Sequence, residues 1–215
     1  MRFQSASNKK GITLIELLVA LAICGIVIAA IYRLFIGQTR AYTVQDQVVE
    51  VQQNVRNAME ILLRDLRMAG FDDDDLDSTI QIGNAIVPPL SDNSVMVNYE
   101  YFDRAGATYQ NHVVQYFVNE SNLFRQSTVN SVAGPPEVLL ENVDALNFIY
   151  GIDLVPGDGL IDNWVPAVSV GANKVIAVRV TLTARPAPVN PDVQQLISPR
   201  TLTSAVSLRN LSLIR

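Results

Sequence analysis

Near its beginning the chain reads Lys9-Lys10-Gly11-Ile12-Thr13-Leu14-Ile15-Glu16-Leu17, and apolar residues then dominate as far as Ile36. The uninterrupted part, Ile12 to Ile31, has the length of ~20 residues that a helix needs to cross a bilayer core. Glu16 is the one charged residue in that part. A carboxylate is costly inside a membrane and marks a functional site there. The segment is therefore predicted to be a membrane helix with a functional carboxylate near its start.

This segment has two ordinary explanations. A secretory signal peptide has an apolar region of about 7–15 residues closed by a small-residue cleavage site, and this run is longer, carries Glu16 and has no such site. A plain single-pass anchor fits better, because Lys9 and Lys10 would stay in the cytoplasm and the C-terminal region would lie outside it. The plain anchor leaves Glu16 without an explanation.

The stretch from Lys9 to Leu17 resembles the type III signal sequence of prepilins, the precursors of type IV pilins. In that family a dedicated peptidase cleaves after the glycine on the cytoplasmic side and methylates the new N-terminal amine. The resemblance implies cleavage between Gly11 and Ile12 and N-methylation of Ile12. The family usually has phenylalanine at the position of Ile12, which is a departure in this chain.

The resemblance also implies a partner for Glu16, the N-terminal amine of a neighbouring subunit in a fibre. Pairing a buried carboxylate with a buried ammonium offsets two desolvation costs and sets the axial register of the subunits. Glu16, Thr13 and Leu14 are therefore the predicted assembly residues. The implied partners are the prepilin peptidase, the major pilin, other minor pilins and the inner membrane.

The helix is predicted to continue well beyond the apolar run, because no proline occurs between Ile12 and Gly70. Apolar residues recur there every three or four positions, as in an amphipathic helix. These residues are Val44, Val48, Val51, Val55, Ala58, Leu62, Leu66 and Ala69. The stripe would pack on a coiled-coil partner or on the chain's own sheet. We favour the sheet, because the stripe spans under four heptads and a β-rich region follows.

The region after Gly70, a natural C-terminal stop for the helix, is predicted to form strands separated by turns. The predicted strands are Thr79–Ile82, Ser94–Phe102, His112–Val118, Leu123–Ser127, Val138–Leu140, Ala145–Tyr150, Val175–Thr183 and Thr201–Leu208. Residues 119–122, Asn-Glu-Ser-Asn, are predicted to form a hairpin turn. The fold class is therefore α+β, a long N-terminal helix packed on an antiparallel β-sheet domain.

Patches of the sequence resemble PilW-like minor pilins. They are the helix end Leu62–Gly70, the stretch Leu140–Gly151 and the closing Ser204–Asn210. Many major pilins have a proline near the position of Arg33, and its absence favours a minor subunit. The J-type minor pseudopilins of type II secretion share the general plan.

These observations predict four parts of the chain. They are a cleaved leader at 1–11, a transmembrane and assembly segment at 12–36, an amphipathic helix segment at 37–70 and an extracytoplasmic head at 71–215. Before assembly the protein would be a single-pass inner-membrane protein with a cytoplasmic N-terminus. Afterwards it would lie in a surface pilus or a periplasmic pseudopilus.

Charge and composition argue against two other classes of function. The net charge is -5, and removal of the leader with Arg2, Lys9 and Lys10 leaves 13 basic residues against 21 acidic ones. A nucleic-acid-binding protein usually has a basic patch, and none stands out. No Ser/Asp or Cys constellation accompanies His112, the one histidine, so an enzyme is not expected. Cys24 is expected to be a small apolar residue of the helix.

Two acidic clusters follow the helix. Asp72–Asp75 with Asp77 is expected to be a solvated loop. Asp153, Asp158 and Asp162 lie in a segment rich in Asp, Gly and Asn, whose oxygens suit calcium. The spacing is not that of an EF-hand, so a plain turn stays open beside a calcium site. No other cofactor is expected.

The sequence favours a minor type IV pilin that takes part in pilus assembly or initiation through its N-terminal helix. Two alternatives stay open, a minor pseudopilin of a type II secretion system and a membrane-anchored envelope binding module that never polymerises.

Overall fold

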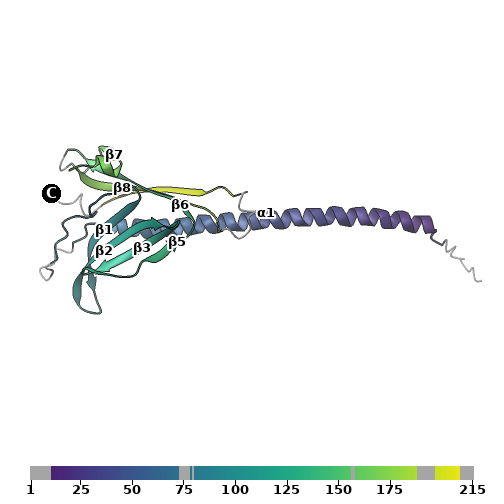
Figure 1. Cartoon of the computed structure of the whole chain (residues 1–215), viewed down its shortest axis with the longest axis horizontal. Helices are drawn as coiled ribbons and strands as arrows, with labels where there is room; N and C mark the ends of the chain where they lie inside the picture. The colour runs from purple at the N-terminus through teal and green to yellow at the C-terminus, as the bar shows by residue number, and fades with distance from the viewer. Residues whose placement is uncertain (1–10, 73–77, 79, 156–157, 188–196, 209–215) are drawn as a thin grey trace, which may run out of the picture. The chain divides into compact units, whose positions relative to one another are not determined.

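The computed structural model describes residues 11–72, 78, 80–155, 158–187 and 197–208. The predicted leader lies outside them except for Gly11, as do Asp73–Asp75 and Asp77. The chain divides into two compact units, residues 1–45 and residues 46–215. Helix α1, Leu14–Met68, supplies residues to both units (Figure 1).

In the first unit, α1 runs through Gly25 and Gly37 without a break. Two of its threonine hydroxyls bond to the helix itself. Thr39 Oγ1 donates to the carbonyl of Phe35 at 2.9 Å, and Thr43 Oγ1 donates to the carbonyl of Thr39 at 3.1 Å. This i to i−4 pattern satisfies the two hydroxyl groups within the helix.

In the second unit, α1 buries the predicted apolar stripe from Val51 onward, whereas Val44 and Val48 are only partly buried. Val51, Val55, Ala58, Leu62, Leu66 and Ala69 are all buried, together with Met59 and Leu63. The core cluster that contains them also contains residues of the β-strands. Packing of the stripe on the chain's own β-structure, rather than on a coiled-coil partner, is thereby confirmed.

The helix ends where the sequence predicts. Gly70 has a φ of 73°, a left-handed conformation that glycine adopts without the steric cost of a Cβ. Its amide donates to the carbonyl of Asn98 at 2.8 Å. The turn that ends α1 is thus tied to the first strand of the β-region.

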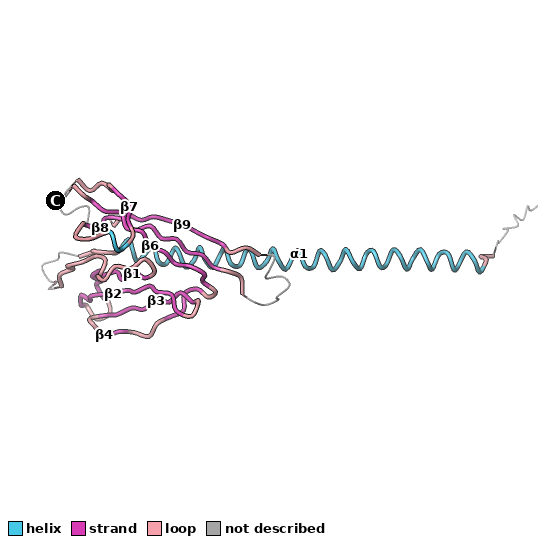
Figure 2. Tube along the Cα trace, turned by 45° about the horizontal axis from the view of Figure 1, so that its top comes forward, coloured by secondary structure: helices cyan, strands magenta, loops and turns pink. Residues whose placement is uncertain are grey.

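The strands form two antiparallel sheets, which Figure 2 shows in magenta. The first sheet contains β1 (Ser94–Asp103), β2 (Thr108–Asn119), β3 (Asn122–Val129), β4 (Val132–Ala133) and β5 (Glu137–Leu140). The second contains β6 (Val143–Asp153), β7 (Asn163–Val165), β8 (Lys174–Ala184) and β9 (Arg200–Ser207). A short 3-10 helix, Ala167–Ser169, precedes β8.

Strand order follows the chain in the first sheet, with β1, β2, β3 and β4 in sequence and β5 also paired with β3. The second sheet has the order β7-β6-β8-β9. In both views the two sheets flank the part of α1 that belongs to the second unit (Figures 1 and 2). The fold is therefore α+β with antiparallel sheets, as the sequence predicts.

The alternation of side chains along the strands explains why both sheets bury one face. In β8, Val178, Val180 and Leu182 are buried, whereas Arg179 and Thr181 between them are partly exposed. Tyr116 of β2 and Phe148 of β6 are fully buried in the same core as Leu62 and Leu66 of α1. One core therefore joins the helix to both sheets.

The predicted hairpin turn is confirmed. Asn119 pairs with Asn122, and Glu120 and Ser121 between them have φ angles of 47° and 60°. Two consecutive positive φ values are the backbone of a type I′ turn, whose twist matches that of the flanking strands.

The predicted strand Thr79–Ile82 is wrong for the residues described, because 80–82 form a loop. The backbone amides here bond to side chains rather than to a neighbouring strand. The amide of Ile80 donates to Ser78 Oγ, and the amide of Ile82 donates to Asp72 Oδ2. The short strands β4 and β7 were not predicted, since two or three residues are too few for an alternating pattern.

Candidate functional site: the N-terminal assembly segment and the Asp65 network

The predicted assembly residues Thr13 and Glu16 lie together at the start of α1. Glu16 Oε2 accepts hydrogen bonds from the Thr13 amide at 2.9 Å and from Thr13 Oγ1 at 2.8 Å. The Glu16 amide donates to Thr13 Oγ1 at 3.3 Å. This reciprocal pair is a capping box, which satisfies amides that the first helical turn leaves open. The carboxylate of Glu16 is thus held at the helix start by its own chain.

The two oxygens of the Glu16 carboxylate differ in their surroundings. Oε2 carries both bonds from Thr13, whereas Oε1 has no hydrogen-bond partner among the residues that the structure describes. An ionised carboxylate accepts several hydrogen bonds. Glu16 is therefore able to accept a further donor without releasing Thr13.

The backbone just before α1 is accessible and is not helical. Residues 11–13 lie outside the helix, and a Cβ added to Gly11 would meet no atom within 4 Å. Ile12 is 79% exposed and Leu14 is 77% exposed. The predicted cleavage site and its neighbours are accordingly accessible.

The first half of α1 exposes an extensive apolar surface. A window of α1 has a mean hydropathy of 2.9, and none of that window is buried. Large apolar residues exposed on it include Ile15, Leu17, Leu18, Leu21, Ile23, Ile26, Ile28, Ile31, Leu34 and Phe35. An exposed apolar area of this extent indicates a surface that lipid or other chains cover. Cys24 is exposed on the same helix with a free thiol.

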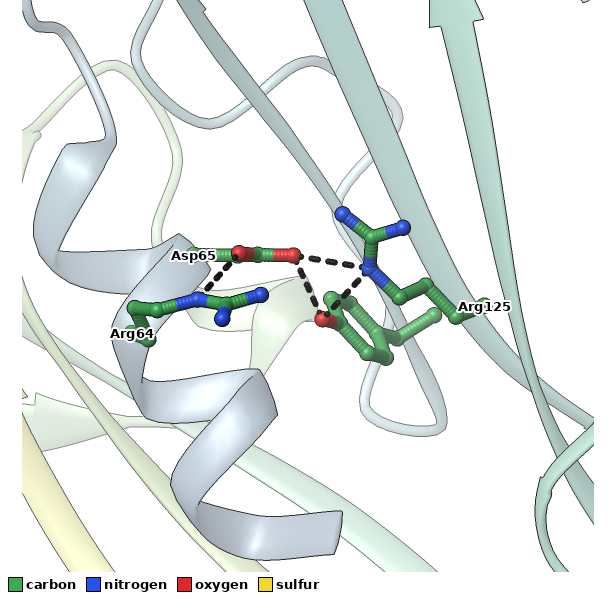
Figure 3. A network of polar contacts seen from close by, with 4 residues as sticks. Arg64, Asp65 and Arg125 are labelled. Atoms are coloured by element: carbon green, nitrogen blue, oxygen red, sulfur yellow. Dashed lines mark hydrogen bonds and ion pairs between the residues drawn. The ribbon is translucent and has the colours of Figure 1, made fainter. Parts of the chain in front are cut away.

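A buried polar network joins the second unit's part of α1 to the first sheet (Figure 3). Asp65 of α1 is 3% exposed. Its Oδ2 accepts from Tyr116 Oη at 2.7 Å and from Arg125 Nε at 2.9 Å. Arg125 Nε also lies 3.2 Å from Tyr116 Oη. A buried carboxylate is tolerated when it is paired and hydrogen-bonded in this way.

Arg64, on the solvent side, completes the network. Its Nε lies 3.4 Å from Asp65 Oδ1, and its side chain is 67% exposed. The Arg125 side chain is 22% exposed by comparison. Arg64 is therefore the weak, solvated partner of Asp65, and Arg125 is the strong one.

The electrostatics of the network extend to the aromatic side chains beside it. Burial, then the negative charge of Asp65, raises the pKa of Tyr116 far above its ordinary value. The same two causes raise the pKa of Tyr99. Burial lowers the pKa of Arg125, but Asp65 and Tyr116 outweigh it and leave that pKa raised. The hydroxyl of Tyr116 is accordingly a donor at neutral pH, and Arg125 is a cation.

His112 lies against the same region of the first sheet. Its ring stacks on Tyr99 with centroids 5.6 Å apart and meets Tyr101 edge-on at 5.5 Å. Its Nε2 is 3.3 Å from Gln110 Oε1. Burial, then the positive charge of Arg125, lowers the pKa of His112. The residue is placed by aromatic packing.

The candidate calcium residues lie on and after β6. Asp162 Oδ2 accepts from the amide of Leu154 at 2.7 Å, and Asp158 Oδ1 accepts from the amide of Leu160 at 2.9 Å. Asp153 is 5% exposed, and its Oδ1 has no hydrogen-bond partner among the described residues. Within those residues no group of three or more His, Cys, Asp or Glu side chains is placed to hold a metal. Calcium binding stays a prediction, and a titration that leaves the melting temperature unchanged would remove it.

Two known protein families match separate parts of the chain. Residues 6–32 match the prokaryotic N-terminal methylation motif, which covers Gly11, Thr13, Glu16 and the exposed apolar helix as far as Tyr32. Residues 108–205, from β2 into β9, match the Type IV Pilus-assembly protein W family. The chain is similar to PilW-like type IV pilins. No curated protein matches it.

The two matches support a role for this PilW-like pilin as a minor pilin in pilus assembly. Both families are structural components of pili rather than enzymes. The apolar helix and the methylation motif together indicate that the pilin is anchored in a membrane.

Sequence reasoning missed the Asp65 network of the pilin. A signal was present, because Leu62, Asp65, Leu66 and Ala69 are spaced three, four and seven residues from the first. That spacing puts Asp65 on the buried face of the helix. Its partners Tyr116 and Arg125 had no comparable signal, since only the register of β2 and β3 brings them to the helix.

Proposed function

We propose that the chain is a minor type IV pilin whose peptide bond between Gly11 and Ile12 is cleaved by a prepilin peptidase, with N-methylation of Ile12. The proposal is supported by the accessible, non-helical backbone at Gly11 and Ile12 and by the methylation motif around it. Cleavage would turn the amide of Ile12 into an ammonium next to Thr13.

The observation that carries the proposal is the capping box of Thr13 and Glu16. It fixes the carboxylate at the helix start and leaves Oε1 open to a donor. In a fibre, that donor is the N-terminal ammonium of a neighbouring subunit. Since an isolated carboxylate and an isolated ammonium are each costly in an apolar environment, pairing them favours assembly.

In this function the subunit starts as a single-pass protein of the inner membrane with a cytoplasmic N-terminus. The exposed apolar half of α1 then leaves lipid and packs with the helices of the major pilin and other minor pilins. The head, residues 71–215, lies outside the cytoplasm, on the pilus.

Mass spectrometry of the mature N-terminus tests the proposal. The expected chain begins at Ile12 and carries one added methyl group. A mature chain that still begins at Met1 would exclude both pilin functions.

A second measurement distinguishes the minor pilin from the two alternative functions. The chain is expected in fibres sheared from the cell surface. Its recovery in a periplasmic pseudopilus instead would favour a minor pseudopilin of type II secretion. Its recovery only in the membrane fraction would favour an envelope binding module that never polymerises.

A further inference from the structure

No described residue pairs with the outer edge of β9. In the part of the chain that the structure describes, β9 pairs with β8 alone, in a continuous antiparallel register. The amide of Leu208, which follows β9, donates to the carbonyl of Ile176 at 2.8 Å. Because backbone groups alternate in direction along a strand, Leu202, Ser204 and Val206 also direct theirs toward β8. The amides and carbonyls of Thr201, Thr203, Ala205 and Ser207 therefore face away from the sheet.

Side-chain contacts across the β8–β9 pair agree with this assignment. Thr203 Oγ1 lies 3.0 Å from Thr181 Oγ1, and Thr201 Oγ1 lies 2.9 Å from Thr183 Oγ1. Side chains approach most closely at the pairs whose backbones do not bond each other. Thr201 and Thr203 thus belong to non-bonded pairs, and their backbone groups are directed outward.

This edge also lacks the usual protection against strand addition. Such edges are normally shortened, bulged, charged or interrupted by proline. β9 extends over Arg200–Ser207 without a register shift, and Arg200 is its one charged residue. The edge strands β4 and β7 are short, with two and three residues.

The outer edge of β1, unlike that of β9, is covered by loops. The amide of Val87 donates to the carbonyl of Met96, and the amide of Glu100 donates to the carbonyl of Phe71. Asn98 uses both of its backbone groups, with Ala85 and Gly70. The chain thus covers the edge of β1 with its own loops, whereas no described residue does this for β9.

A cationic groove adjoins the start of β9. A cavity of about 460 Å³ is lined by Gln52, Val55 and Arg56 of α1 and by residues 199–202. The Nε of Arg200 is buried and has no hydrogen-bond partner among the described residues. Arg56 is exposed, and the ion pairs between described residues include neither arginine. Of the residues that the structure describes, two arginines and no acidic residue line the groove, so it favours an anionic occupant.

We propose that the β9 edge and this groove bind an extended acidic segment of a neighbouring subunit in the fibre. The segment adds as a strand beside Thr201–Ser207 and places carboxylates against Arg56 and Arg200. Main-chain hydrogen bonds supply affinity in such β-augmentation, and alternate side chains supply specificity. This inference rests on the proposed function, because the partner is another subunit of the same fibre.

Ala205→Pro tests the edge in the full chain. Proline removes an amide that faces outward, and it is tolerated on an edge strand for that reason. Ala205 has no side-chain hydrogen bond to lose. We expect the melting temperature in detergent to stay within a few degrees of the parent, and the amount of chain in sheared fibres to fall at least tenfold. Incorporation at the parent level would overturn the proposal.

Ser204→Pro is the matched control. The amide of Ser204 faces β8, so this substitution breaks the ladder between β8 and β9 and should lower the melting temperature. A melting temperature equal to the parent's would show that the assignment of inward and outward amides is reversed, which also overturns the proposal.

Arg56→Glu and Arg56→Lys test the charge of the partner segment. Arg56→Glu should lower incorporation into fibres at least fivefold, because it repels an acidic segment. Arg56→Lys should keep most of the incorporation. Equal incorporation of the two variants would overturn the acidic character of the partner.

Hydrogen exchange on the unmodified chain tests the proposal without any variant. The amides of Thr201, Thr203, Ala205 and Ser207 should exchange rapidly in detergent and at least tenfold more slowly in affinity-captured fibres. Equal rates in the two states would overturn the inference alone. Slow exchange in detergent would mean that the chain covers its own edge, which also overturns it. Absence of the chain from fibres would overturn the proposed function as well.

Discussion

The hydroxyl of Tyr116 donates a 2.7 Å hydrogen bond to Oδ2 of Asp65, and this bond joins α1 to β2 across 51 positions of the sequence. Arg125 of β3 donates to the same oxygen at 2.9 Å. One buried carboxylate thus fixes the rotation of the helix against two neighbouring strands. Because the other residues that the structure shows buried on α1 are apolar, the Asp65 network adds directional specificity to the packing.

Asp65→Ala should destabilise the head strongly. Loss of one partner of a buried ion pair leaves the other charge uncompensated, at a cost of about 3–5 kcal/mol. We expect a decrease near the lower end of that range, because the Arg125 side chain is 22% exposed and water can reach it. Thermal and denaturant unfolding of the full chain in detergent measures the effect.

Arg64→Ala is the control for Asp65→Ala. Its side chain is 67% exposed and lies 3.4 Å from Asp65, so the change in the free energy of unfolding should stay below about 1 kcal/mol. Similar losses for the two variants would contradict the distinction between a strong inner pair and a weak outer one.

The free energy of unfolding should fall at alkaline pH. Burial raises the pKa of Tyr150 from 10.0 to about 12 and raises that of Tyr116 further. A pKa raised in the folded state means stability that is complete below pH 10 and is lost as the pH rises through the folded pKa. Each tyrosine should contribute a slope of about 1.4 kcal/mol per pH unit between pH 10 and its folded pKa.

Tyr150→Phe and Tyr116→Phe separate these contributions. Tyr150→Phe should make the free energy of unfolding depend less on pH between pH 10 and 12. Tyr116→Phe should reduce the same dependence over a range that continues to higher pH. Denaturant unfolding at a series of alkaline pH values measures both. A parent chain whose stability is flat from pH 9 to 12 would contradict the assignment.

Gly70→Ala should destabilise the chain through the backbone. Gly70 has a φ of 73°, and a left-handed conformation costs a residue with a Cβ about 1–2 kcal/mol. Gly37 is the matched control, since it lies inside α1 and a Cβ there meets no atom within 4 Å. Gly37→Ala should be neutral or stabilising by up to about 1 kcal/mol. The melting temperatures of the two variants, compared in detergent, should move in opposite directions or differ by several degrees.

Glu16→Gln should separate membrane insertion from assembly. Glutamine keeps the acceptor oxygen for Thr13 and removes the charge that the ammonium of a neighbour needs. The amount of chain in the membrane should equal that of the parent, and the amount in sheared fibres should fall at least tenfold. Glu50→Gln, on an exposed position of the same helix, should leave both unchanged. Fibres that contain the Glu16→Gln chain at the parent level would disprove the pairing.

Much of the fold could be predicted because its signals are local. The apolar stripe from Val51 to Ala69 follows the helical period, and Gly70 supplies the residue type that a left-handed helix end requires. Thr13 followed three residues later by Glu16 is the sequence pattern of a capping box. The alternation of Val178, Val180 and Leu182 with Arg179 and Thr181 gives β8 a buried and an exposed face.

Other features depend on pairing between distant residues and had no local signal. The predicted strand Thr79–Ile82 is a loop in the residues described, because Asp72 and Ser78 take its amides. The division of the strands into two sheets arises from the pairing of β6 with β8 and β7 rather than with β5. A residue-by-residue pattern specifies which face of a strand is buried but not which strand lies next to it.

The sequence by itself determined the membrane-type helix, its carboxylate at Glu16 and the candidate cleavage site at Gly11, because each is a property of neighbouring residues. Only the tertiary structure decided that Asp65 meets Tyr116 and Arg125, and that loops cover the edge of β1 whereas no described residue covers that of β9. Those outcomes depend on strand register and on contacts between segments more than 50 residues apart, such as Asp65 and Tyr116. The energies of such long-range contacts depend on the packed core as a whole, so no single stretch of sequence specifies them.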